Sequence, residues 1–412
     1  MTVHPIVAAL RRHKVAVLLI VLQIALTLAI VANAIFIIGQ RIERMGRPTG
    51  ADESGLIWIL QQWPAAPAGD DAVAIEQLDG LQRTDLATLR SLPDVQDVAA
   101  STSIPLLSGY TTGDITLNAG QKGLSVHVAH YYGDQHLRHT LGLQLIAGRD
   151  FDASEIRHGR AHADSPVIIV SKPVADALFP NGNALGHTVY QDDGKPSTIV
   201  GIVERLQIPR RSESTWAFNS VLEPFRDDES WSGYVVRARP GRVKAAMREV
   251  RKALFVVNPM RLMPGPLGGI HAFDEIRARA YRSDRGMALL MSVICVILLC
   301  VTAAGVVGLT SFWVGQRYRQ IGVRRALGAR RIDILRYFQI ENLLIAGGGV
   351  VAGALFAFGL NEWLMTHYEM TRLPVLYVAI GVLAMLALGQ AAVLVPARRA
   401  SNVSPVTATR SV

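Results

Sequence analysis

Four long stretches without a charged side chain constrain the fold of this chain more than any other feature. They run over Val15–Ile38, Gly286–Val314, Leu343–Leu360 and Val375–Val395. A hydrocarbon core of about 30 Å takes about 20 apolar residues in a helix, so each stretch predicts a membrane-spanning helix, the third near the short limit. A cleaved signal peptide is the alternative for the first stretch. Its apolar run is too long for one, and Gly39-Gln40-Arg41 is not a small-residue cleavage site.

The distribution of Lys and Arg orients these spans. Residues 1–14 carry three basic side chains and no acid, residues 315–340 carry seven arginines against Asp333, and residues 396–412 carry three arginines. Cytoplasmic loops are enriched in Lys and Arg, so both termini and the loop are predicted to face the cytoplasm. The formal net charge of +9 comes from these segments, and the rest of the chain is net negative. The charge therefore reflects topology and gives no support to nucleic-acid binding.

The resulting fold class is an α-helical membrane protein with four transmembrane helices and a large α/β extracytoplasmic domain inserted between helices 1 and 2. The predicted parts are a cytoplasmic N-terminus at 1–14, spans at 15–38, 286–314, 343–360 and 375–395, an outer domain at 39–285, a cytoplasmic coupling loop at 315–342, a short outer link at 361–374 and a cytoplasmic tail at 396–412. The protein is expected in the bacterial inner membrane.

The outer segment mixes strand and helix patterns. Strands are predicted at Leu56–Leu60, Ser125–Ala129, Val167–Val170, Thr198–Val203 and Tyr234–Ala238, and helices at Thr84–Leu92, Lys172–Phe179 and Val243–Leu254. The order of the strands does not follow from these patterns. No proline occurs between Pro266 and Pro374. One continuous helix from about Ala272 to Val314 is therefore predicted as a stalk that extends the second span outward, with a break near Ser283–Gly286 as the alternative.

The loop between the second and third spans carries the most specific string of residues. Gln316–Ala326 predicts a basic helix, Gly328 a break, and Arg330–Glu341 a second, amphipathic helix with Ile332 and Leu335 on one face. Such a helix across the cytoplasmic ends of two spans suits docking on a soluble partner. The alternative is that the arginines only anchor topology and contact lipid phosphates.

This loop resembles the FtsX/MacB family of ABC permeases. The order Ile321-Gly322-Val323-Arg324-Arg325-Ala326-Leu327-Gly328-Ala329 and the C-terminal Pro396-Ala397-Arg398-Arg399-Ala400 are similar to the family's loop and tail motifs. Leu141–Phe151, Pro166–Ser171 and Ala177–Pro180 look like the core of a MacB-type periplasmic domain. Together with the number of spans, these matches cover almost the whole chain.

The resemblance implies a permease subunit that couples ATP hydrolysis by a separate ATPase to movements of its periplasmic domain. It places Arg324, Arg325, Ala326, Leu327, Gly328, Ala329 and Asp333 in the coupling region. The implied partners are a cytoplasmic ABC ATPase, a second permease in a homo- or heterodimer, a periplasmic adaptor protein and membrane lipid. Export of a peptide, an antibiotic or lipid-linked cargo and mechanotransmission, in which no substrate crosses the bilayer, are all compatible with it.

Motifs for other chemistry are absent from the sequence. No G-x-x-x-x-G-K-[ST] occurs, so ATP and magnesium are expected on a partner ATPase and no cofactor on this chain. Metal-ligand motifs and nucleophile motifs are also missing. Four histidines, His127, His130, His136 and His139, fall within 13 residues, but their spacing fits no zinc pattern and no metal site is predicted.

Gly349 and Gly353 form a G-x-x-x-G in the third span. This spacing predicts close helix packing, either at a dimer interface or within one protomer. Two other function classes remain as alternatives to the permease. One is a membrane-anchored sensor or scaffold that binds an outer ligand without transport, and the other is a membrane-tethered enzyme, for which no catalytic constellation is found.

Overall fold

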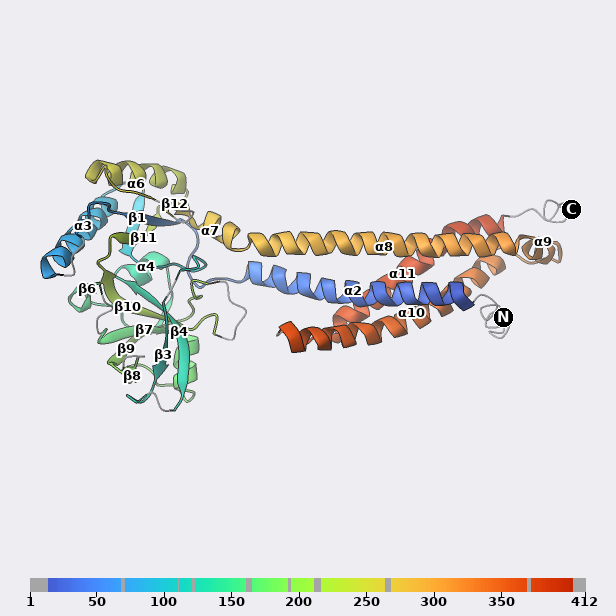
Figure 1. Ribbon diagram of the computed structural model, residues 1–412, viewed down its shortest axis with the longest axis horizontal. Helices are drawn as coiled ribbons and strands as arrows, with labels where there is room; N and C mark the ends of the chain where they lie inside the picture. Colours follow the sequence, from blue (N-terminus) through green and yellow to red (C-terminus); the bar gives the residue numbers. More distant parts are fainter. Residues whose placement is uncertain are drawn as a thin grey trace. The chain divides into compact units, whose positions relative to one another are not determined.

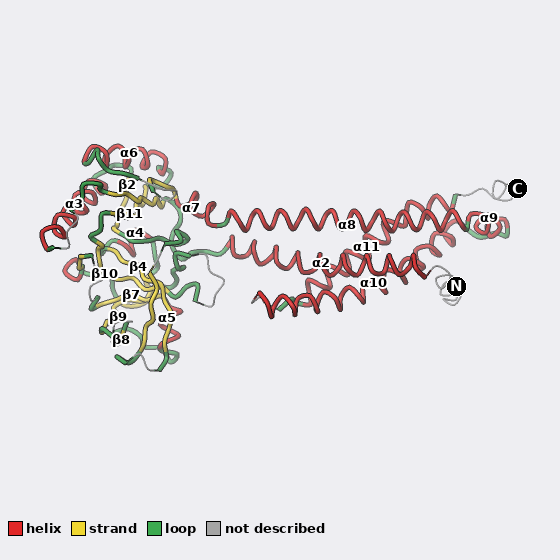
Figure 2. Tube along the Cα trace, viewed as in Figure 1, coloured by secondary structure: helices red, strands yellow, loops and turns green. Residues whose placement is uncertain are grey.

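The computed structural model describes residues 14–67, 71–109, 111–120, 123–160, 165–191, 194–210, 216–263, 268–368 and 372–402. The chain divides into two compact units. One unit comprises Met1–Gly46 and Ser283–Val412, and the other comprises Arg47–Arg282. Strands are confined to the second unit among the described residues, whereas the first is built from helices (Figure 2).

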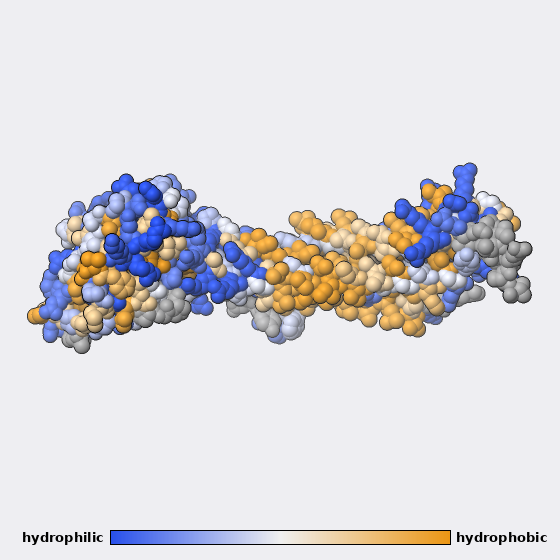
Figure 3. Space-filling model, turned by 90° about the horizontal axis from the view of Figure 1, so that it is seen from above, coloured by the Kyte–Doolittle hydropathy of each residue, from blue (hydrophilic) through white to orange (hydrophobic). Residues whose placement is uncertain are grey.

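Among its described residues, the helical unit contains four long helices and one short one (Figure 1). They are α2 (Lys14–Gly46), α8 (Arg282–Gln316), α9 (Tyr318–Ala326), α10 (Arg331–Tyr368) and α11 (Val375–Ser401). The four long helices are each long and apolar enough to cross a membrane. Apolar side chains cover their outer surface (Figure 3), among them Leu18, Leu289 and Leu355, each at least 65% exposed. In water such a surface would be unfavourable, whereas lipid tails accommodate it.

Glycines bring α10 and α2 into close contact. A Cβ atom at Gly349 would lie 2.8 Å from the Cβ of Ile24, and one at Gly353 would lie 2.9 Å from the backbone oxygen of Ala25. The G-x-x-x-G pair therefore packs α10 against α2 of the same chain. Asn33 on α2 adds a hydrogen bond from its Nδ2 to the backbone oxygen of Ala357, 3.1 Å away.

Helix α8 contacts α2 through polar side chains. Thr27 and Thr302 share a hydrogen bond of 2.8 Å between their hydroxyl groups, and Gln23 donates to the backbone oxygen of Val301. Nearer the start of α8, Arg41 forms an ion pair with the buried carboxylate of Asp284. Interhelical hydrogen bonds of this kind contribute about 0.6–2 kcal/mol each in membrane proteins, so they fix the register of α8 on α2.

The outer unit begins and ends with a four-stranded antiparallel sheet. Its order is β12-β1-β11-β2, from β1 (Leu56–Gln62), β2 (Val95–Ala100), β11 (Trp231–Ala238) and β12 (Gly269–Ala272). Helices α3 (Ala72–Arg90) and α6 (Val243–Val257) pack on this sheet in a shared apolar core (Figure 1). The chain forms two βαβ units in this layer, β1-α3-β2 and β11-α6-β12. The strands β1 and β11 lie in the centre and β2 and β12 at the edges, which is a split βαβ, or ferredoxin-like, arrangement.

The second sheet is inserted between β2 and β11. It is formed by β3 (Thr111–Thr116), β4 (Ser125–Gly133), β5 (Leu145–Gly148), β6 (Arg157–Gly159), β7 (Val167–Ser171), β8 (Thr188–Tyr190), β9 (Pro196–Val203) and β10 (Ser220–Asp227), with helices α4 (Leu137–Leu141) and α5 (Lys172–Leu178) between them. The order β4-β3-β8-β9-β7-β10 is closed by the pairing of β10 with β4, so these six strands form a small barrel.

A buried ion pair joins helix and sheet in the four-stranded layer. Arg261 donates two hydrogen bonds to Asp85 of α3, at 2.8 and 2.9 Å, and both side chains have at most 1% of their surface exposed. The Asp85 carboxylate also accepts from Gln61 on β1 and from the hydroxyl of Tyr234 on β11. A buried charge is tolerated only when it is paired and hydrogen-bonded, so this network specifies where α3 lies on the sheet.

The predicted fold class is confirmed, and two local predictions outside the cytoplasmic loop are wrong. The continuous stalk is interrupted, because α7 (Phe273–Ala280) ends before Tyr281 and α8 begins at Arg282, running through Gly286. Arg277 holds α7 in the outer unit by donating to Glu53 and to the backbone oxygen of Arg47. The helix predicted at Thr84–Leu92 starts a dozen residues earlier, with Asp71 as its N-cap, and tolerates Gly80 in its interior.

The packing of α10 on α2 predicts the effect of enlarging Gly349. We expect Gly349→Val to destabilise the protein by roughly 1–3 kcal/mol, because the new side chain would overlap Ile24. Gly347→Val is the matched control, since no atom lies within 4 Å of a Cβ atom there. Thermal unfolding of the detergent-solubilised chain measures both variants, and equal losses would contradict the packing.

Candidate functional site

The predicted coupling residues lie on α9 and on the turn that joins it to α10. The helix ends at Ala326, and the amides of Gly328 and Ala329 donate to the backbone oxygens of Arg325 and Arg324, both at 3.1 Å. Gly328 has φ of +97°, a left-handed conformation that favours glycine at a helix end. Asp333 then caps α10 by accepting from the amide of Arg330 at 3.0 Å.

The structure corrects the second half of the loop prediction. Arg330–Glu341 does not form a separate amphipathic helix, because α10 runs without a break from Arg331 to Tyr368 and includes the third span. Ile334 and Phe338 of this segment are buried in the apolar core of the helical unit. Their packing favours continuation of the helix over a break, so α9 is the only short helix between α8 and α10.

Several arginines of the loop bind within the chain. Arg325 donates to the backbone oxygen of Ser401 at 2.6 Å and so ties α9 to the end of α11. The guanidinium of Arg324 lies 5.5 Å from the centre of the Tyr337 ring, a cation–π contact. Arg317 forms an ion pair with the buried Glu341 at 3.0 Å. The basic residues therefore shape the loop besides anchoring its topology.

The turn after α9 exposes apolar side chains. Leu327 is 83% exposed, and Val323 and Ile332 are exposed by about half. On the opposite side of α9, Ile321 and Gly322 are buried against the helical core. An exposed Leu at a rigid turn, bordered by arginines such as Arg330, is typical of a surface that binds another protein.

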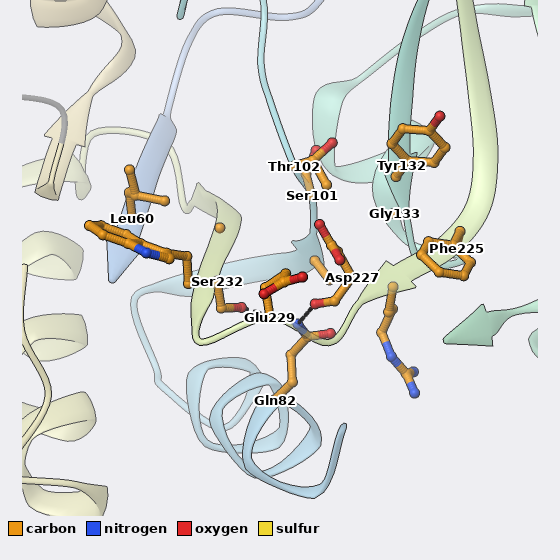
Figure 4. A pocket seen from close by; sticks show the side chains of 14 residues that line it. Leu60, Gln82, Ser101, Thr102, Tyr132, Gly133, Phe225, Asp227, Glu229 and Ser232 are labelled. Carbon is orange, nitrogen blue, oxygen red and sulfur yellow. Dashed lines mark hydrogen bonds between the residues drawn. The ribbon is translucent and has the colours of Figure 1, made fainter. Parts of the chain in front are cut away.

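A second candidate site, a cavity of about 270 Å³, lies between the two sheets of the outer unit (Figure 4). It is lined by side chains from α3, β4, the end of β10 and the start of β11, among them Gln82, Tyr132, Phe225, Asp227 and Trp231. The short connection from β10 to β11 crosses from one sheet to the other and carries the acidic run Asp227-Asp228-Glu229. The sequence patterns did not predict this site, although the three consecutive acids are a visible signal for it.

Burial raises the pKa of two carboxyl groups in this connection. Burial, together with repulsion from Glu229 and Asp228, raises the pKa of Asp227 to about 7. Burial also raises the pKa of Asp228 to about 6, against the opposing effect of a 2.7 Å hydrogen bond with His158. Carboxyl groups with raised pKa values in a cavity mark a candidate binding site.

Glu76, Asp79 and His158 are close enough together to hold a metal ion. Both oxygens of Asp79 are engaged, one by Arg226 and the other by Arg83 at 2.7 Å, and Arg83 also pairs with Glu76 at 2.6 Å. Two guanidinium groups therefore already neutralise the carboxylates that a metal ion would need. The group is an ion-pair network around the buried end of Asp79.

The four clustered histidines pair with separate carboxylates. The pairs are His127 with Asp114 at 2.7 Å, His130 with Glu223 at 2.5 Å, and His136 and His139 with the two oxygens of Asp97 at 3.0 and 2.8 Å. Burial raises the pKa of Asp97, but its hydrogen bonds with His136 and His139 hold that pKa well below its usual range. The carboxylates come from distant parts of the sequence, which explains why spacing alone did not reveal them.

The four apolar helices, with a mixed α/β domain between the first and the second, define a multi-pass membrane protein. Two family models match the chain. A MacB-like periplasmic core domain matches residues 17–253, more than half of the chain, and an FtsX-like permease C-terminal domain matches residues 292–405. The chain therefore belongs to the MacB/FtsX-type ABC permease family, and the domain between the first two helices is periplasmic.

Curated relatives are similar over much of the chain. A probable export ATP-binding/permease protein of Pseudomonas fluorescens is 26% identical over 97% of this chain and 58% of its own length. A macrolide export ATP-binding/permease protein of Chromobacterium violaceum is 25% identical over 65% of this chain and 41% of its own length. This chain thus spans about half the length of these relatives. The crystal structure of the periplasmic region of MacB from Actinobacillus actinomycetemcomitans covers 57% of this chain and 97% of its own, at 16% identity and a TM-score of 0.35.

The raised pKa of Asp227 predicts how stability depends on pH. The folded state holds its proton up to about pH 7, whereas an unfolded Asp loses it near pH 4. The contribution of Asp227 to stability is therefore full below about pH 4 and is lost as the pH rises through about 7. We expect Asp227→Asn to raise the Tm by a few degrees at pH 8 and to have a smaller effect at pH 5.

Thermal unfolding of the full chain at the two pH values measures this difference. Asp176→Asn on α5 is the control, because that carboxylate is 60% exposed and pairs only with Lys172 on the surface. An Asp227→Asn effect that is the same at pH 5 and pH 8 would show that Asp227 does not titrate in this range.

Proposed function

We propose that this chain is the permease component of an ABC transporter of the bacterial inner membrane, with both termini in the cytoplasm. A cytoplasmic ATPase that binds ATP and magnesium drives it. The relatives support this proposal, because their names join an ATP-binding and a permease function and this chain matches about half of their length. The positions of the arginines support the orientation, since α9 and the last turn of α11 are both basic.

The observation that carries the proposal is the exposed apolar surface at the turn after α9. Leu327 projects into solvent at 83% exposure, although the turn that holds it is rigidly hydrogen-bonded. An apolar side chain fixed in this way stabilises a complex most when a groove on the partner covers it. A fully buried Leu contributes about 1.5–3 kcal/mol to the free energy of binding. The arginines around it would lie at the rim of that contact.

Coupling then follows from where the turn lies. Together with α9 it joins α8 to α10, and Arg325 links α9 to the end of α11. A movement of the ATPase against Leu327 would therefore act on three long helices together. Of these, α8 follows directly in sequence on the periplasmic domain, so ATP hydrolysis is coupled to movement of that domain, for export of cargo or for mechanotransmission. The permease works as a dimer with a second permease chain.

The exposure of Leu327 predicts the effect of a charged side chain at this position. We expect Leu327→Asp to weaken co-purification of the ATPase at least tenfold, because a carboxylate would be buried at the centre of the contact. Pull-down from detergent or nanodiscs, with ATPase activity as the readout, measures the effect. Leu327 makes few contacts within the chain, so the fold should be unaffected.

Val256→Asp is the matched control for this experiment. Val256 is 75% exposed at the end of α6 in the periplasmic domain, so the same change there should leave ATPase binding intact. If no ATPase associates with the wild-type chain under any nucleotide condition, the permease proposal fails and a sensor or scaffold takes its place. If an ATPase binds equally well to both variants, its docking site lies elsewhere.

A further inference from the structure

Two residues that line the cavity between the two periplasmic sheets have buried acceptor atoms without a donor among the described residues. Gln82 is 3% exposed, and its Nε2 donates to the backbone oxygen of Asp227 at 3.2 Å and to the Ser232 hydroxyl at 3.1 Å. A backbone oxygen can only accept, so the amide orientation is fixed and the atom left without a partner is Oε1. Oδ1 of Asp227 is buried and unpartnered as well. Buried acceptors in native proteins nearly always have a donor, which points to a ligand with N–H or O–H groups.

Two carboxyl groups at the cavity have no cationic partner in the ranges that the structure describes. Within the described part of the chain, neither Asp227 nor Glu229 forms an ion pair, and both line the cavity. Arg226 also lines it, but its guanidinium pairs with Asp79 of α3. Withdrawal from water without a cation disfavours the charged form of such a carboxyl group, and a bound cation would favour that form.

Carbon-rich side chains also line the cavity. They are those of Leu60, Tyr132, Phe225 and Trp231, the last at 42% exposure. Figure 4 places Tyr132 and Phe225 on one side of the cavity and Gln82 and Glu229 on another. Mg²⁺ and Ca²⁺ take six or more oxygen ligands and gain nothing from aromatic side chains. An organic cation uses both sides, through its charge and through its apolar body.

We propose that this cavity binds an organic ligand through a primary ammonium group. The three N–H donors of such a group correspond to the acceptors offered by Asp227, Gln82 and Glu229, and the ligand's apolar part lies against the aromatic side chains. The cavity is part of neither α9 nor the turn at Leu327. Its occupancy requires no nucleotide, so this inference and the ATPase proposal fail or succeed separately.

The probe for this inference is 2-phenylethylammonium, which joins one primary ammonium group to one phenyl ring. Isothermal titration of the full chain in nanodiscs, corrected with empty nanodiscs for partitioning into lipid, measures its binding. We expect saturable binding, weakened about tenfold or more by Glu229→Gln and by Asp227→Asn, since a hydrogen bond to a charged group contributes about 1.5–3 kcal/mol. Asp176→Asn removes an exposed carboxylate elsewhere in the domain and should leave binding unchanged.

Two analogues of the probe distinguish the contribution of its positive charge from that of its N–H donors. The neutral 2-phenylethanol keeps the ring and one donor, and the N-trimethylated amine keeps the ring and the charge without any N–H. Both should bind at least fivefold more weakly than the primary amine, because each lacks one of the two features that the cavity recognises.

Four results would overturn the inference. They are no saturable binding of the amine, equal binding of 2-phenylethanol, unchanged binding in both cavity variants, or binding of Mg²⁺ or Ca²⁺ that displaces the amine. Circular dichroism of Glu229→Gln and Asp227→Asn, matched to wild type, ensures that a loss of binding reflects the cavity and not unfolding.

Discussion

The close approach of α10 to α2 is the contact on which the helical unit depends. Lipid tails are as apolar as Leu, so burial of apolar area does not hold two spans together, and close packing and hydrogen bonds must. Gly349 and Gly353 permit that approach, and Asn33 adds a hydrogen bond to the backbone of α10. Helix α8 contacts α2 through the Thr27–Thr302 pair and at Gly305, which lies against Gln23. Its most apolar part is 17% buried, less than that of the other three long helices, so the helix that continues from the periplasmic domain is less embedded than its neighbours.

The periplasmic domain is subject to a different constraint, because the segment that forms its second sheet is inserted between two strands of the first sheet, β2 and β11. The two connections between the sheets must leave and re-enter the four-stranded layer without disturbing it. Gln82 of α3 binds the returning connection at the backbone of Asp227 and at Ser232. One turn further along, Arg261 holds the same helix through Asp85. The acids of the connection are thus held near the junction of the sheets, and their raised pKa values follow from that placement.

Sequence patterns predicted the features that local composition determines. Charge-free runs predicted the four long apolar helices, and the loop and tail motifs indicated the family, because both signals lie in contiguous residues. The break at Tyr281 was not predicted, because the residue that most disfavours a helix there, Gly286, lies within α8, and the break accompanies contacts of Arg277 with distant residues. The cavity was missed for the same reason: Gln82 and Asp227 are separated by more than a hundred residues and meet only through the order of the strands.

The corner formed by α8, α9, α10 and α11 explains why a short loop is sufficient for coupling. Arg317, at the end of α8, is paired with Glu341 inside α10, and Arg325 of α9 is bonded to the end of α11. Buried ion pairs and closely fitted cores resist gradual deformation, so a displacement at one of these helices is shared by the others. The exposed residue at this corner, Leu327, is then the point where a small apolar contact can act on the whole helical unit.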